Sequence, residues 1–137
     1  MLQRQGISNF LAQPERIEEY ISLIEKLPLV IQAGRYGIVH SLVPKGVAWD
    51  VFVQKSGQYR DYILWRRNKR YNEIIDGIEA VIAGHTIHKD PVQLGSVMDI
   101  DTGAFLKYRD GYDGRLTVLQ IGESCVRGGG ITPGLML

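Results

Sequence analysis

Two histidines that follow short apolar runs are the residues of this sequence whose setting could support chemistry. His40 ends the run Gly37-Ile38-Val39, and His85 follows the run 80–83 after one glycine, Gly84. A short apolar run is typical of a buried strand, so each imidazole is expected at the rim of a sheet. Neutral imidazole is a common ligand of zinc, manganese and iron. The pair predicts part of a metal site, and the alternative is that each is a hydrogen-bonded structural histidine.

Other segments supply the elements that must position these histidines. Apolar side chains at helical spacing after Pro14, ending at Pro28, predict a helix whose role is packing only. A second, short helix is expected over 47–54. Its aromatic residues could line a groove, but core packing is the favoured interpretation. The expected strands are 29–32, 36–40, 80–83, two within 92–101 separated by Gly95-Ser96, 105–108 and 116–121.

Several sequence blocks over roughly residues 9 to 122 resemble a known family in their order and spacing. They are Leu27-Pro28-Leu29-Val30-Ile31, Gly37-Ile38-Val39-His40, Ile63-Leu64-Trp65-Arg66-Arg67, Gly84-His85-Thr86, Ile100-Asp101-Thr102-Gly103-Ala104 and Leu116-Thr117-Val118-Leu119-Gln120-Ile121. The set is similar to the C-terminal part of the bacterial and phage-type serine/threonine phosphatases of the calcineurin-like metallophosphoesterase superfamily.

The resemblance implies an α/β fold, namely half of a two-sheet β-sandwich with flanking helices. It implies hydrolysis of phosphomonoesters on a phosphorylated protein or a small phosphoester, with a divalent metal that is expected to be manganese, with zinc or iron as alternatives. His40 and His85 would both bind the second metal of a dinuclear centre, and Arg67 would bind the substrate phosphate. A guanidinium suits that role because it forms two parallel hydrogen bonds to phosphate oxygens.

The family motifs GDxHG, GDxxDRG and GNHE, which carry most of the metal ligands, are missing from this sequence. We therefore expect residues 1–122 to form the C-terminal half of a catalytic domain and 123–137 a flexible tail. The chain alone is expected to be inactive, with the other half encoded separately or in a longer enzyme. A non-catalytic remnant or binding module of the same fold is the alternative. Strands 29–32, 36–40 and 80–83 would then keep an unpaired apolar edge.

Three further features bear on function. His88 follows His85 but is one position away from the family's Gly-His-x-His ligand pattern, so it is expected in a loop. Asp101 either orients a metal-bound histidine or caps a turn. The basic run 65–71 contains two aromatic residues, which could indicate nucleic-acid binding, but a solvated face beside Arg67 is the favoured interpretation.

Composition limits the remaining classes of function. With 137 residues, 45% hydrophobic and 23% charged, the chain is expected to form a soluble domain with a core. A net charge of +1 gives no bulk attraction to nucleic acid or membrane, and neither is expected as a partner. No apolar run approaches the ~20 residues of a membrane span. A single cysteine, Cys125, and no apparent signal peptide suit a reducing cytoplasm.

Overall fold

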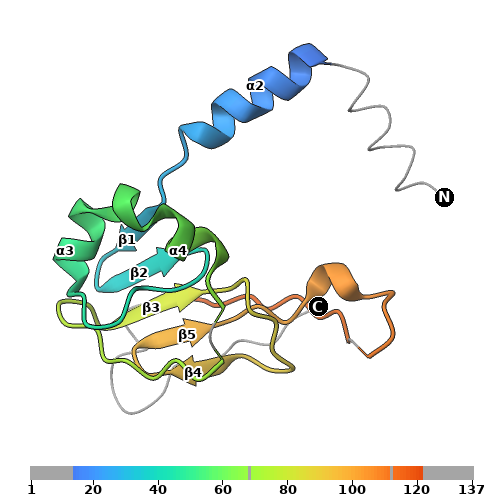
Figure 1. Ribbon diagram of the computed structural model, residues 1–137. Helices are drawn as coiled ribbons and strands as arrows, with labels where there is room; N and C mark the ends of the chain where they lie inside the picture. The colour runs from blue at the N-terminus through green and yellow to red at the C-terminus, as the bar shows by residue number, and fades with distance from the viewer. Residues whose placement is uncertain (1–13, 68, 112, 122–137) are drawn as a thin grey trace.

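The computed structural model describes residues 14–67, 69–111 and 113–121, and its centre is a mixed five-stranded sheet (Figure 1). The strands are β1 (Val30–Ala33), β2 (Tyr36–Val39), β3 (Ala80–Ala83), β4 (Val92–Leu94) and β5 (Val97–Asp99). They lie in the order β1-β2-β3-β5-β4. β2, β3 and β5 run parallel, while β1 and β4 pair antiparallel with their neighbours along the chain. The expected α/β class and these five strands are confirmed.

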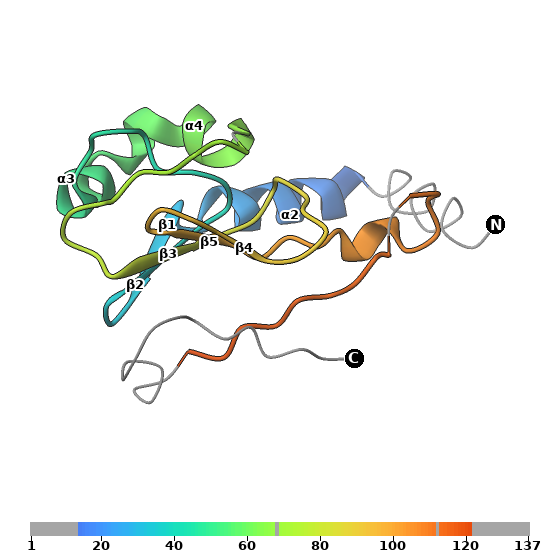
Figure 2. The same cartoon turned by 90° about the horizontal axis from the view of Figure 1, so that it is seen from below.

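The long connection from β2 to β3 carries the helices that cover one face of the sheet (Figure 2). These are α3 (Trp49–Gln54), the 3-10 helix η1 (Ser56–Tyr59) and α4 (Arg60–Trp65). The helix expected over 47–54 is thus confirmed, and its aromatic side chains join the core rather than a groove. The main core on this face contains Val39, Leu42, Val43, Trp49, Phe52, Ile63, Tyr71, Ile75, Val81, Ala83, Leu94 and Val97.

Trp49 packs on the sheet where β2 has no side chain. A Cβ added at Gly37 would overlap the indole ring, so the close approach of Trp49 requires glycine there. The indole Nε1 donates a hydrogen bond of 2.8 Å to Gln32 Oε1 on β1. This contact ties α3 to the edge of the sheet.

The opposite face of the sheet carries an apolar row that runs across four strands. Ile31 pairs with Ile38, Ile38 with Ile82, and Ile82 with Met98 in the strand register. Leu119 packs against a small second cluster on this face, and its segment passes beneath the sheet in Figure 2. That segment, 116–121, does not form the strand expected there.

The strand expected over 105–108 is also absent. Gly103, with φ of 73°, starts the 3-10 helix η2 (Ala104–Leu106). Thr102 Oγ1 then donates a hydrogen bond of 2.6 Å to the Arg115 carbonyl and lies 2.8 Å from Thr117 Oγ1. These side-chain bonds hold the returning segment where a strand ladder was expected. The sequence pattern missed this because it records apolar spacing and not side-chain to backbone bonds.

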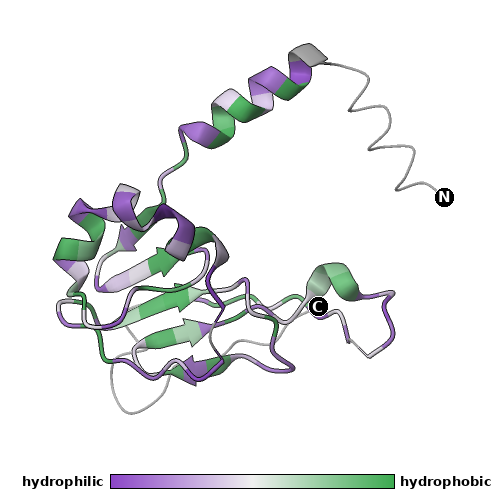
Figure 3. Cartoon of the chain, in the orientation of Figure 1, coloured by the Kyte–Doolittle hydropathy of each residue, from purple (hydrophilic) through white to green (hydrophobic). Residues whose placement is uncertain are grey.

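α2 (Pro14–Glu25) forms where a helix was expected, but it does not pack as predicted. Its apolar side chains alternate with polar ones, and it extends away from the sheet (Figure 3). Exposed apolar residues of this helix and the turn after it are Tyr20, Ile21, Leu23, Ile24 and Leu27. The apolar periodicity predicted the helix correctly. Periodicity alone does not show whether another element covers the apolar face of a helix, and among the described residues no element covers this one.

Of the three strands expected to keep an unpaired apolar edge, only β1 lies at an edge of the sheet. β1 is an edge strand, and Ile31 on it is 49% exposed. β2 and β3 lie inside the sheet and pair on both sides, so the expectation was wrong for them. The expected tail, 123–137, lies outside the described residues.

Candidate functional site

Three parallel strands end at the same edge of the sheet, and each delivers a polar residue there. His40 follows β2, Gly84-His85 follows β3, and Asp101 lies two residues beyond β5. The ladder continues past the strands, since Gly84 N–H donates to the His40 carbonyl at 3.0 Å. Ligands of open α/β sheets bind outside the carboxyl ends of parallel strands, and this edge is therefore the place to look for a site.

The two histidines lie side by side, as expected. His40 Nε2 and His85 Nδ1 are 3.0 Å apart, and the ring centroids are 4.7 Å apart with the rings tilted by 57°. The indole of Trp65, at the end of α4, meets the His85 ring edge-on with a centroid distance of 6.2 Å. The sequence-based expectation about their proximity is confirmed, and their role as metal ligands stays a prediction.

His85 has an unusual backbone. Its φ is 68°, and it is the one non-glycine residue with positive φ in the described ranges 14–67, 69–111 and 113–121. The left-handed region costs a residue with a Cβ about 1–2 kcal/mol. Strain of this kind persists where the surrounding structure holds it, and it is concentrated at functional sites.

The surroundings of His85 favour its neutral form. Burial lowers the pKa of His85, and the nearby charges of Arg67 and His40 lower it further. A backbone hydrogen bond at Trp65 and the carboxylate of Asp101 act on this pKa in the opposite direction. Nδ1 of His85 faces Nε2 of His40 at 3.0 Å, so a metal ion shared by the two rings would need a lone pair on both of these nitrogens. A lone pair on a neutral ring is what a metal ion requires.

Arg67 lies near enough to act on His85 electrostatically, and it is exposed. Among the described residues no carboxylate lies within ion-pair distance of its guanidinium. A cation without an acidic partner beside two imidazoles suits an anionic ligand. The expectation that Arg67 points towards the cleft beside the histidines, and that it binds phosphate there, stays a prediction.

Asp101 acts as a turn cap. Its Oδ1 accepts a hydrogen bond of 2.9 Å from Gly103 N–H. A Cβ added at Gly84 would lie 3.5 Å from Asp101 Cβ, which is ordinary contact, so space alone does not require glycine before His85. Among the described residues no hydrogen bond joins Asp101 to either histidine of the pair.

The sequence reasoning missed a second histidine contact. His88 Nε2 lies 3.2 Å from Oδ2 of Asp99, the last residue of β5, whose side chain is 1% exposed. Burial raises the pKa of Asp99 to about 6, while His88 and a hydrogen bond from Asp101 N–H oppose the shift. The available signal was an aspartate inside the apolar run 97–100, since a buried carboxyl needs a partner.

The aromatic residues of the basic run lie in two different environments. Of its two aromatic residues, Trp65 is 70% exposed but Tyr71 is 1% exposed and belongs to the core. Arg66 lies over the Tyr62 ring, 5.8 Å from its centroid. These contacts favour a local structural role for the aromatics of this segment.

The described residues do not complete a metal site. They contain no group of three or more His, Cys, Asp or Glu side chains that could hold an ion. No helix within them has both the length and the apolar content needed to cross a membrane. Cys125 lies outside the described ranges. Comparison with known proteins does not assign a family, since no protein-family model and no curated protein matches the chain.

Proposed function

We propose that this chain contributes one part of a metal-dependent phosphatase site that hydrolyses phosphomonoesters, with phosphoserine or phosphothreonine in proteins as the substrate. Support comes from His40 and His85 at the carboxyl edge of three parallel strands and from Arg67 beside them. The fold proposed with it is a partial metallophosphoesterase fold, in which the apolar row Ile31, Ile38, Ile82 and Met98 would face a second sheet.

The observation that carries the proposal is the distance of 3.0 Å between His40 Nε2 and His85 Nδ1. Two ligands at right angles, each about 2.1 Å from an ion, stand about 3.0 Å apart, whereas the tetrahedral angle gives about 3.4 Å. The separation is therefore close to what one shared ion requires, with Mn²⁺ as the proposed metal and zinc or iron as alternatives. Neutral imidazoles are suitable donors for these metals.

In this proposal His40 Nε2 and His85 Nδ1, both without a proton, hold the ion. When bound, a divalent metal polarises phosphoryl oxygens and lowers the pKa of water. Arg67 binds the phosphoryl oxygens with two N–H donors. The strained backbone at His85 keeps its ring aimed at His40.

Two neutral ligands hold a divalent ion weakly because no carboxylate balances its charge. The carboxylates would come from another polypeptide segment, encoded separately or in a longer chain. The exposed apolar residues of α2 and of the turn after it, among them Ile24 and Leu27 at 59% each, support contact with such a segment. The cytoplasm is the proposed location, because the cellular phosphoproteins expected as substrates are found there.

A second candidate is a non-catalytic binding module of the same fold. The absence of a three-residue ligand group within the described part of the chain favours it. In that case one ring N–H donates to the other ring nitrogen, and the contact is structural. The two candidates differ in whether both histidines take part in metal binding.

Calorimetric titration with MnCl₂ at pH 7.5 separates them. We expect one weak site in the wild-type chain, weakened further by His40→Ala and by His85→Ala, while the control His88→Ala leaves it unchanged. Hydrolysis of an aryl phosphate with manganese should be negligible for the isolated chain and should rise on addition of a polypeptide carrying the three missing motifs. Manganese affinity that is the same in both alanine variants and the wild type would refute the proposed site.

A further inference from the structure

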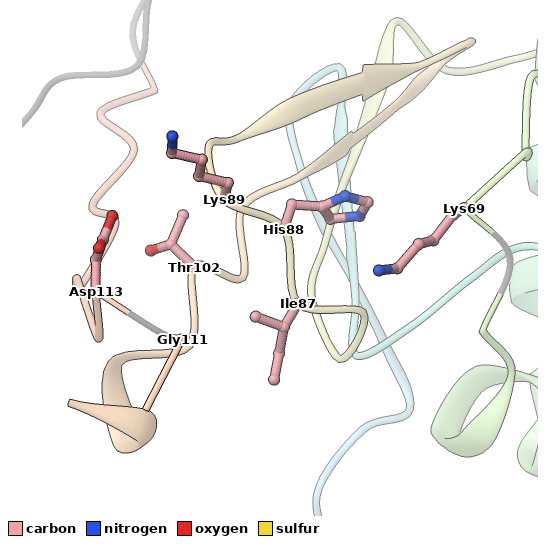
Figure 4. Close-up of a pocket in the computed structure, with 7 residues that line it drawn as sticks. All are labelled: Lys69, Ile87, His88, Lys89, Thr102, Gly111 and Asp113. Carbon is pink, nitrogen blue, oxygen red and sulfur yellow. The ribbon is translucent and has the colours of Figure 1, made fainter. Parts of the chain in front are cut away.

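A pocket of about 520 Å³ lies among the loops that leave the carboxyl edge of the sheet. Its lining residues are Lys69, Ile87, His88, Lys89, Thr102, Gly111 and Asp113. Figure 4 shows that these side chains come from separate segments of the chain. The pocket contains neither His40 nor His85, and it is distinct from the imidazole pair.

Positive charge is in excess at this pocket. Among the described residues, neither Lys69 nor Lys89 has a carboxylate within ion-pair distance. Asp90 is bound by Arg115 at 2.6 Å, and Asp113, whose Oδ2 lies 3.9 Å from Arg115 Nε, is the one acidic side chain among the lining residues. Two ammonium groups without acidic partners around a concave surface favour an anionic ligand.

His88 forms a fixed wall of the pocket. Its ring is held against Asp99 at 3.2 Å, and its backbone N–H donates to the Asp101 carbonyl at 2.9 Å. Both partners come from the end of β5, so the loop that carries His88 and Lys89 is fastened to the sheet. A wall held in this way limits the conformational entropy lost when a ligand binds.

Two lining residues of the pocket closely follow residues of the proposed phosphatase site along the chain. Lys69 is two residues after Arg67, and His88 is three residues after His85. Three residues of chain span at most about 11 Å, which bounds the separation of the His85 and His88 backbones. An extended peptide covers the same length in about three residues.

We propose that this pocket binds a second anionic group of the substrate, a carboxylate or a phosphate two or three residues from the phosphoryl group that is hydrolysed. The inference rests on the proposed phosphatase function and adds a substrate class to it, namely phosphopeptides with acidic flanks. Lys69 and Lys89 provide the attraction, and Asp113 limits it.

The test is peptide binding measured by fluorescence polarisation in EDTA, so that no metal takes part. One labelled phosphoserine peptide carries aspartate two and three residues from the phosphoserine, a second carries phosphoserine at those positions, and a third carries asparagine. We expect the aspartate and phosphoserine peptides to bind about tenfold more tightly than the asparagine peptide, from two partly exposed charge pairs. The first two peptides distinguish carboxylate from phosphate as the preferred group.

Substitutions in the pocket test whether its lysines cause this preference for acidic peptides. Lys69→Gln with Lys89→Gln should abolish it, and Asp113→Asn should strengthen binding of the acidic peptides about twofold. The matched control, Lys26→Gln with Lys55→Gln, removes the same charge from exposed positions away from the pocket and should keep the preference. A preference that is absent in the wild type, or equal in the pocket variant and the control, would overturn the inference.

Failure of the phosphatase proposal and failure of the pocket inference would give different experimental results. His40→Ala and His85→Ala should retain the peptide preference in EDTA, because neither residue lines the pocket. If manganese fails to bind while the lysine-dependent preference persists, the pocket inference stands and the metal site does not. If manganese binds at the imidazole pair and no peptide preference exists, only the pocket inference fails.

Discussion

Replacing His85 by glycine and by alanine tests whether its backbone is strained for the sake of its imidazole. Both variants remove the ring and its contact with His40, so they differ only in the Cβ. At φ of 68° the Cβ costs about 1–2 kcal/mol, an amount that exceeds the usual entropic disadvantage of glycine. We therefore expect His85→Gly to be more stable than His85→Ala by about 1 kcal/mol.

His40 provides the matched control, because its φ is not positive. There the usual order should hold, with His40→Ala more stable than His40→Gly by about 0.5–1 kcal/mol. Urea unfolding followed by far-ultraviolet circular dichroism, at pH 7 in EDTA, gives the four unfolding free energies. If alanine is as stable as glycine at position 85, the ring is not held by a strained backbone and that part of the reasoning is wrong.

The remaining predictions concern the core and the buried carboxyl. Gly37→Ala should lower the free energy of unfolding by about 1–3 kcal/mol because the new Cβ overlaps Trp49. Urea titration should show no such loss for the control Gly57→Ala, whose Cβ meets open space. Burial raises the pKa of Asp99 to about 6, so its folded form retains a proton that the unfolded chain releases. Consequently the stability of the wild type relative to Asp99→Asn should fall between about pH 4 and 6, by at most about 1.4 kcal/mol per unit, and a rise over this range would contradict the shift. Tyr71 is buried, and its hydroxyl has no hydrogen-bond partner in the described part of the chain. Tyr71→Phe should therefore leave the midpoint of thermal unfolding unchanged or raise it. A large drop in that midpoint would mean that the hydroxyl is hydrogen-bonded.

The proximity of the two histidines was predictable because it follows from strand patterning. Apolar runs that end in His40 and Gly84-His85 become parallel neighbours, β2 and β3, whose ends share one edge of the sheet. The φ of His85 was not predicted from the sequence, because positive φ is uncommon for non-glycine residues, even though histidine is among the residues enriched there. Arg67 lowers the pKa of His85 electrostatically, while the direction in which its side chain points stays a prediction.

Most of the features that the sequence did not predict depend on contacts between residues far apart in the chain. The periodicity of α2 identified a helix, but it did not show that Ile24 would lack a covering element among the described residues. The run 116–121 has the alternation of a strand, yet Thr102 anchors the segment before it through Arg115. His88 and Asp99 are eleven positions apart, and no sequence pattern indicated that their side chains would be in contact.

The most direct test of the account is ¹⁵N NMR of the imidazole nitrogens during a titration with Zn²⁺, a diamagnetic probe of the proposed manganese site. The chain has three histidines, so His88 serves as an internal control. The account predicts that His40 Nε2 and His85 Nδ1, which lie 3.0 Å apart, shift together toward the values of metal-bound nitrogen while the nitrogens of His88 do not. Shifts confined to His88, or two nitrogens of the pair that stay unchanged at millimolar zinc, would contradict it.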